Sequence, residues 1–142
     1  MHPWRQLRGL PHIDVVWSRD DQLLDGADAW WYPGRDMILM DSRLLQVERR
    51  CALAHELAHI ERGDEPCGSD WLDARQELAA DRWAARELIP VERLCRALQW
   101  SGDRHEVADE LWVTVDMLQV RLDHLHPSEK HYLRRMLADT ED

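Results

Sequence analysis

Two histidines and a glutamate that lie within five residues of one another are the side chains of this sequence best suited to chemistry. They are His55, Glu56 and His59, in the run LAHELAH. On a helix, side chains four residues apart project from the same side, so both imidazoles can reach one metal ion. Glu56 is offset around the helix, close enough to accept a proton from a water molecule bound to that metal. This H-E-x-x-H spacing predicts a zinc site with Glu56 as the general base of a hydrolase.

A catalytic zinc ion needs a third protein ligand and one open coordination position. The run QELAAD, residues 76–81, belongs to the next expected helix and supplies Glu77, with Asp81 one turn further along on the same side. We expect Glu77 to be the third ligand, and Asp81 to accept a hydrogen bond from a ligating histidine and so fix its tautomer. Four further carboxylates nearby remain alternative ligands: Asp64, Glu65, Asp70 and Asp73.

The two motifs together are similar to those of a known protein family. The segment HELAHIERGD, residues 55–64, followed by RQELAADRWAARELIP, residues 75–90, resembles the ImmA/IrrE family of small metallopeptidases. The hairpin expected before the first motif and the stretch VADELWVTV, residues 107–115, fit this family as well. The resemblance therefore extends over about residues 28–125.

This resemblance implies a minimal gluzincin-like zinc metallopeptidase domain. It implies zinc bound by His55, His59 and Glu77, with Glu56 as general base. It also implies a site-specific endopeptidase whose partner is a protein substrate, namely a regulatory protein such as a helix-turn-helix transcriptional repressor.

Two parts of the peptidase mechanism remain open in the sequence. Hydrolysis needs a donor for the oxyanion of the tetrahedral intermediate, and the candidates are Tyr32, His105, His124, His126, His131 and Tyr132. An extended substrate can pair with an edge strand, and the run MILM, residues 37–40, is a candidate for that strand. The alternative is that this run is an ordinary buried strand of the hairpin.

Two other functions are compatible with parts of the sequence. The first is a regulatory or binding module that keeps the zinc fold without turnover, but Glu56 between the histidines favours the peptidase, because a structural zinc needs no base. The second is a DNA-binding protein that uses residues 104–124, which have the outline of a helix-turn-helix. We predict no specific nucleic-acid binding, because acidic side chains in and just before this segment outnumber those that read DNA. The acidic side chains are Asp103, Glu106, Asp109, Glu110, Asp116 and Asp123. The side chains able to read DNA are Arg104, Gln119 and Arg121.

A small sheet and a series of helices must position these residues. β-prone runs predict a strand at residues 12–17 and a hairpin at 29–41. Apolar spacing of three and four residues predicts helices at 43–62, 70–88, 91–100, 104–111, 115–124 and 127–137. The expected class is α+β, with a small N-terminal antiparallel sheet and a helical majority. We expect one domain over residues 1–142, with the sheet and metal helices at about 12–90 and a C-terminal helical part at about 91–142.

Composition excludes several classes of protein. With 18 Lys and Arg against 28 Asp and Glu, the 142-residue chain carries a net charge of −10, which argues against a general nucleic-acid binder. It has no apolar stretch long enough to span a membrane and no signal peptide, so we expect a cytoplasmic protein without membrane association. The three cysteines, Cys51, Cys67 and Cys95, fit reduced thiols. Most of the eight tryptophans are expected to lie in the core and not to form a ligand cage.

Overall fold

The structure, a computed structural model that describes residues 2–138, contains the predicted small sheet. Strands β1 (Asp14–Ser18), β2 (Ala29–Tyr32) and β3 (Met37–Asp41) lie in the order β1-β3-β2. The hairpin is confirmed, because β2 pairs antiparallel with β3 across a short 3-10 helix, Pro33–Arg35. In contrast, β1 pairs parallel with β3, so the sheet is mixed and not wholly antiparallel. A parallel pair needs a long connection between its strands, and the chain that includes β2 provides it.

The helical majority is confirmed, with boundaries close to those predicted. The described helices are α1 (Pro3–Arg8), α2 (Asp21–Leu24), α3 (Gln46–Arg62), α4 (Asp70–Leu88), α5 (Val91–Trp100), α6 (Arg104–Leu111), α7 (Val115–Asp123) and α8 (Pro127–Ala138). α3 begins at Gln46 and not at residue 43, because the Glu48 carboxylate accepts the backbone N–H of Leu45 at 2.8 Å and caps the helix there. α1 and α2 were not predicted, since such short helices carry too little periodicity. In the described part of the chain, no helix is both long and apolar enough to cross a bilayer.

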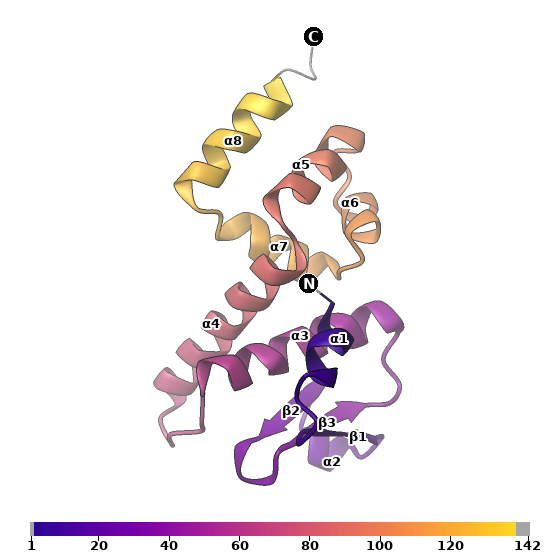
Figure 1. Cartoon of the computed structure of the whole chain (residues 1–142), viewed down its shortest axis with the longest axis vertical. Coiled ribbons are helices and arrows are strands. Elements are labelled where there is room, and N and C mark those ends of the chain that lie inside the picture. The colour runs from indigo at the N-terminus through magenta and orange to yellow at the C-terminus, as the bar shows by residue number, and fades with distance from the viewer. Residues whose placement is uncertain (1, 139–142) are drawn as a thin grey trace.

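Helix α3 lies between two apolar clusters. Its Leu53 and Leu57 pack with Ile38 and Met40 of the sheet. Its Cys51 and Ala54 instead join a larger cluster formed with residues of α4 to α8. Figure 1 shows the sheet with α1–α3 in one half of the molecule and α5–α8 in the other, with α4 extending between them. The helix with the histidine pair is thus held from both sides.

Small side chains allow α3 and α4 to pack directly against each other. Ala54 and Ala58 of α3 are buried, as are Ala80 and Ala84 of α4. Alanine adds little volume at a helix contact, so the two backbones approach closely enough for longer side chains beside the contact to meet. This packing brings the second predicted motif to the first.

The tryptophans are mainly surface residues, so the expectation that they form the core is wrong. None of them is among the buried residues, and Trp71, Trp100 and Trp112 are 65%, 63% and 67% exposed. Leucine, alanine, valine and isoleucine fill most of the two clusters instead. The number of apolar residues indicates how much apolar surface a chain has, but it does not indicate which face of each helix carries that surface.

Candidate metal centre

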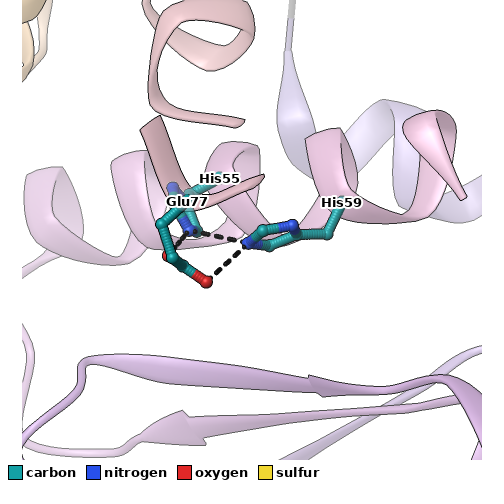
Figure 2. A group of neighbouring side chains, drawn as sticks. All are labelled: His55, His59 and Glu77. Carbon is teal, nitrogen blue, oxygen red and sulfur yellow. Dashed lines mark hydrogen bonds and ion pairs between the residues drawn. The ribbon is translucent and has the colours of Figure 1, made fainter. Parts of the chain in front are cut away.

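His55, His59 and Glu77 converge between α3 and α4 (Figure 2). One potential ligand atom of each side chain lies within 4.8 Å of the other two. Nε2 of His55 is 2.8 Å from one carboxylate oxygen of Glu77, and Nε2 of His59 is 3.0 Å from the other. The two Nε2 atoms are 3.1 Å apart. Two imidazole nitrogens and one carboxylate oxygen that meet at one point are a donor set that fits zinc.

Each histidine is oriented through its other ring nitrogen. Nδ1 of His55 lies 2.7 Å from the carboxylate of Asp81, which is the contact predicted for Asp81. Nδ1 of His59 lies 3.0 Å from the carboxylate of Asp64, which also accepts a hydrogen bond from Nε of Arg62 at 2.9 Å. A carboxylate at Nδ1 favours a proton on that nitrogen and leaves Nε2 as the ligand atom.

Asp64 was predicted only as an alternative metal ligand, whereas in the structure it contacts His59 at Nδ1. The turn that ends α3 explains this position. Gly63 has φ of 72°, a left-handed conformation that favours glycine. The next backbone N–H, that of Asp64, donates to the carbonyl of His59 at 3.0 Å. The chain thereby folds back on the last turn of α3, and the Asp64 carboxylate meets the side of the imidazole away from Glu77. The signal in the sequence was the glycine-aspartate pair directly after the helix.

Glu65, Asp70 and Asp73, the remaining alternative ligands, do not join the cluster. Among the described residues, the group with metal-ligand spacing consists of His55, His59 and Glu77 alone. Asp73, in the first turn of α4, instead accepts a hydrogen bond at 3.1 Å from the backbone N–H of Cys67, which lies in the loop before the helix.

Glu56 is a buried carboxylate next to this cluster. It is 5% exposed, yet it lines the open space on both sides of the two histidines. Burial raises the pKa of Glu56, while the neighbouring His55 and His59 act in the opposite direction. A carboxyl group with a raised pKa, at the edge of a metal cluster, is suited to accept and return a proton.

The hydrogen bonds of the cluster also change the protonation of its members. Burial disfavours the charged form of His55, but hydrogen bonds to Asp81 and Glu77 outweigh this effect and raise its pKa to about 10. The pKa of His59 is likewise raised, since bonds to Glu77 and Asp64 outweigh its burial. The pKa of Glu77 falls far below its usual range, because both histidines donate to it. A metal ion would therefore compete with protons for the two imidazoles.

A cleft extends to both sides of Glu56 and Glu77. The larger part, about 450 Å³, is here called the acidic lobe, and its wall includes the carboxylates of Asp28, Glu48 and Asp116. The smaller part, about 300 Å³, is here called the tryptophan lobe, and its wall includes Trp30, Trp31, Pro33 and Pro66 together with the carboxylates of Asp64, Glu65 and Asp73. Because the ligand cluster lies where the lobes meet, an elongated molecule in the cleft would pass over it.

The strand beside this cleft is β2. It is an edge strand of the sheet, and its Trp30 lines both lobes. Of the two alternatives for residues 37–40, the buried hairpin strand is the correct one, because β3 is the central strand and Ile38, Leu39 and Met40 are buried. A hairpin sequence does not reveal which of its two strands pairs with a third, so the parallel pairing of β1 with β3 decides between them.

The candidate oxyanion donors lie outside the cleft. None of the six tyrosine and histidine candidates lines either lobe of the cleft. Gln76, on α4 directly before Glu77, does line the tryptophan lobe. Its amide is a hydrogen-bond donor on the wall of that lobe, at a position that no sequence motif marks.

The helix-turn-helix outline at α6 and α7 has a different internal role. Arg121 is 3% exposed, and its guanidinium donates to the carbonyl of Ile89 at 2.8 Å and to the carboxylate of Glu129 at 2.9 and 2.5 Å. Val107, Leu111 and Leu118 belong to the larger apolar cluster. One of the few basic side chains of this segment therefore joins α7 to α8 and to the end of α4.

Comparison with known proteins agrees with the predicted resemblance. A family model described as the IrrE N-terminal-like domain, a peptidase family, matches residues 13–123, a range that also includes β1. A solved Mycobacterium tuberculosis transcriptional regulator shares the fold, with a TM-score of 0.69 and 20% identity over 88% of this chain. This chain spans 41% of the length of that regulator. A comparison with curated proteins found no match. Because the family model covers most of the sequence and includes the His-Glu cluster, the chain belongs to the IrrE N-terminal-like domain family.

Proposed function

We propose that this chain is a zinc-dependent endopeptidase that cleaves a regulatory protein at a specific site. The observation that carries the proposal is Glu56, a carboxylate that is 5% exposed and lines a cleft beside the His55, His59 and Glu77 cluster. Structural zinc sites are closed by four protein ligands and need no neighbouring base. Three converging ligands with a buried carboxylate beside them, in an open cleft, are typical of hydrolytic zinc sites.

In this proposal, His55, His59 and Glu77 hold the zinc ion, while Asp81 and Asp64 orient the imidazoles. The bound ion would supply Lewis-acid activation of a water molecule and of the scissile carbonyl. Glu56 accepts the proton of the attacking water and gives it to the leaving amine. Its raised pKa supports this role, since the carboxylate is then a stronger base than an exposed glutamate.

The cleft and the sheet edge support an extended peptide as substrate. A segment that pairs with β2 would add a strand to the sheet and lie across the metal cluster. β2 runs from Ala29, at the acidic lobe, towards Pro33, at the tryptophan lobe. Antiparallel pairing, the more stable arrangement, puts substrate residues before the scissile bond in the tryptophan lobe and residues after it in the acidic lobe. We therefore propose a preference for apolar side chains before the bond and basic ones after it.

A transcriptional repressor of the helix-turn-helix class is the substrate that we propose. Two facts support a regulatory context: membership of the IrrE N-terminal-like domain family, and a fold shared with a protein described as a transcriptional regulator. A repressor encoded beside the gene for this chain is the first substrate to test.

The test compares wild-type chain with Glu56→Gln, both loaded with zinc and incubated with that repressor. Glutamine fills the same space but cannot accept a proton, so we expect retained zinc and a loss of cleavage of about 10²–10⁴-fold. Glu61→Gln, an exposed position on the same helix, is the matched control and should cleave at the wild-type rate. Wild-type turnover by Glu56→Gln would remove Glu56 from the mechanism. A zinc-loaded wild-type chain that binds the repressor without cleaving it would favour a non-catalytic regulatory module.

A further inference from the structure

The face of α4 that points away from the metal cluster carries a second concave surface. It has a volume of about 520 Å³ and is here called the arginine groove. Its lining consists of arginine and apolar residues alone: Arg62, Arg75, Leu78, Ala79, Arg82, Trp83 and Arg86. None of these belongs to either lobe of the cleft beside Glu56.

Apart from Glu87, the charged residues of α4 are separated by sign between two faces of the helix. Acidic residues follow one another at intervals of four, at positions 73, 77 and 81, and Glu77 and Asp81 contact the histidines. Arginines occupy positions 75, 82 and 86, spaced by seven and then four residues, and are exposed. Both spacings keep side chains on one side of a helix. The helix that supplies the third ligand therefore presents a basic surface on its other side.

The charge of the arginine groove is only partly compensated within the described part of the chain. Arg62 pairs with Asp64 at 2.9 Å. Arg75 lies over the ring of Trp71, at 4.9 Å from its centre. Within residues 2–138, no ion pair joins Arg75 or Arg82 to a carboxylate. Arg86 is partly compensated, because its charge helps to lower the pKa of Glu129. A chain with a net charge of −10 that gathers arginines in one groove offers a local site for an anionic partner.

Apolar side chains in the same groove indicate what kind of anion fits. Leu78 is 43% and Trp83 40% exposed, and the nearby Trp71 is more exposed still. Tryptophan and arginine are the residues most enriched at the energetic centres of protein interfaces. A nucleic-acid duplex would meet the negative charge of the surrounding protein and would leave the apolar residues uncovered. A short protein segment that combines carboxylates with apolar side chains matches both properties of the groove.

We propose that the arginine groove docks an acidic, amphipathic helical segment of a partner protein. Carboxylates of the segment pair with Arg75, Arg82 and Arg86, and its apolar side chains pack on Leu78 and Trp83. This inference is independent of the proteolytic function, because it concerns the opposite face of α4.

The test is the binding of a fluorescein-labelled synthetic helix that has glutamates and leucines on one face. Binding is followed by fluorescence anisotropy in the Glu56→Gln background, so that the probe is not hydrolysed. The double variant Arg75→Glu/Arg82→Glu should lower the affinity by about tenfold or more, since repulsion replaces attraction at the binding surface. Arg134→Glu/Arg135→Glu on α8 makes the same change in net charge at exposed positions and should bind as before. Leu78→Ser should also weaken binding, which separates the apolar contribution from the charge.

Each alternative outcome contradicts the proposal. No binding by the parent protein, or equal weakening by the α8 control, means that the groove is not a specific docking site. Equal binding of a scrambled helix with the same composition means that net charge alone attracts the probe. A labelled DNA duplex that binds more tightly than the helix, and loses its affinity in Arg75→Glu/Arg82→Glu, would replace the acidic protein with nucleic acid.

Discussion

The carboxylate of Asp64 lies 3.0 Å from Nδ1 of His59 and reaches it across the left-handed turn at Gly63. His55 has the equivalent relationship with Asp81, at 2.7 Å. Both imidazoles thus have a carboxylate partner behind them, one supplied by the end of α3 and one by α4. The position of His59 depends on a local turn, whereas that of His55 depends on the packing of two helices.

We expect Asp64→Asn to weaken zinc binding by about 10–100-fold, as loss of a carboxylate behind a ligating histidine typically does. The amide can still accept a hydrogen bond but no longer carries the charge that favours the correct tautomer. Competition with a chromophoric chelator measures the affinity, and circular dichroism checks the fold. Glu65→Gln, the exposed neighbour, is the control. Wild-type affinity in Asp64→Asn would show that the contact does not support the metal site.

Zinc binding should weaken as the pH falls. The raised pKa of His55, about 10, means that the metal-free imidazole holds its proton at neutral pH. Zinc must displace that proton, so its apparent affinity falls by about tenfold per pH unit for each proton released. Titration calorimetry from pH 6 to 8, in two buffers with different ionisation enthalpies, measures both affinity and proton release. An affinity independent of pH over this range would contradict the raised pKa.

The pair formed by Arg121 and Glu129 should make the fold sensitive to acid. The hydrogen bonds from Arg121 lower the pKa of Glu129 from 4.5 to about 2. Because the folded value is the lower one, the stabilisation is present above pH 4.5 and is lost as the pH falls towards 2. Urea unfolding at pH 7 and pH 3 should show Glu129→Gln destabilised at pH 7, with a smaller difference from wild type at pH 3. Glu92→Gln, an exposed control, should match wild type at both values.

Local spacing was sufficient to predict helices α3 to α8 and to select His55, His59 and Glu77 as the residues of the cluster. The four-residue interval fixes the histidine pair on one side of α3, and alanines on both helices allow the approach of α4. Asp81 could be predicted for the same reason, since it follows Glu77 by one turn. These features depend on the periodicity of residues within one helix, which can be observed directly in the sequence.

Features that depend on contacts between distant segments could not be predicted in this way. The parallel pairing of β1 with β3 decides that β2 is the edge strand at the cleft, and no local pattern encodes that choice. The exposed positions of Trp71 and Trp83 follow from which face of α4 packs on α3. Asp64 is intermediate between these two kinds of feature. The turn at Gly63 that positions Asp64 is local and can be predicted, but its contact with the His59 imidazole could not be predicted from the sequence.

The two lobes of the cleft should give the proposed peptidase a charge preference. Asp28 and Asp116 line the acidic lobe and are both exposed there. The double variant Asp28→Asn/Asp116→Asn should therefore cleave a substrate with arginine directly after the scissile bond several-fold more slowly, through weaker attraction to the lobe. A matched substrate with glutamine at that position is the control and should be unaffected. Equal effects on both substrates would mean that the two carboxylates support the fold or the metal site and not substrate choice.

The isolated protein should not bind duplex DNA specifically through α6 and α7. Readout of base edges requires exposed Arg, Lys, Asn or Gln side chains on the second helix. Arg121, the only arginine of α7, is buried and bound to Glu129 and Ile89, while the exposed Asp116 would repel phosphates. A gel shift at low salt, where electrostatic attraction is strongest, is the most permissive measurement. Arg104→Ala, at the exposed start of α6, is the informative variant, because Arg121→Ala would disturb the fold itself. Sequence-specific retardation that disappears in Arg104→Ala would restore the DNA-binding hypothesis.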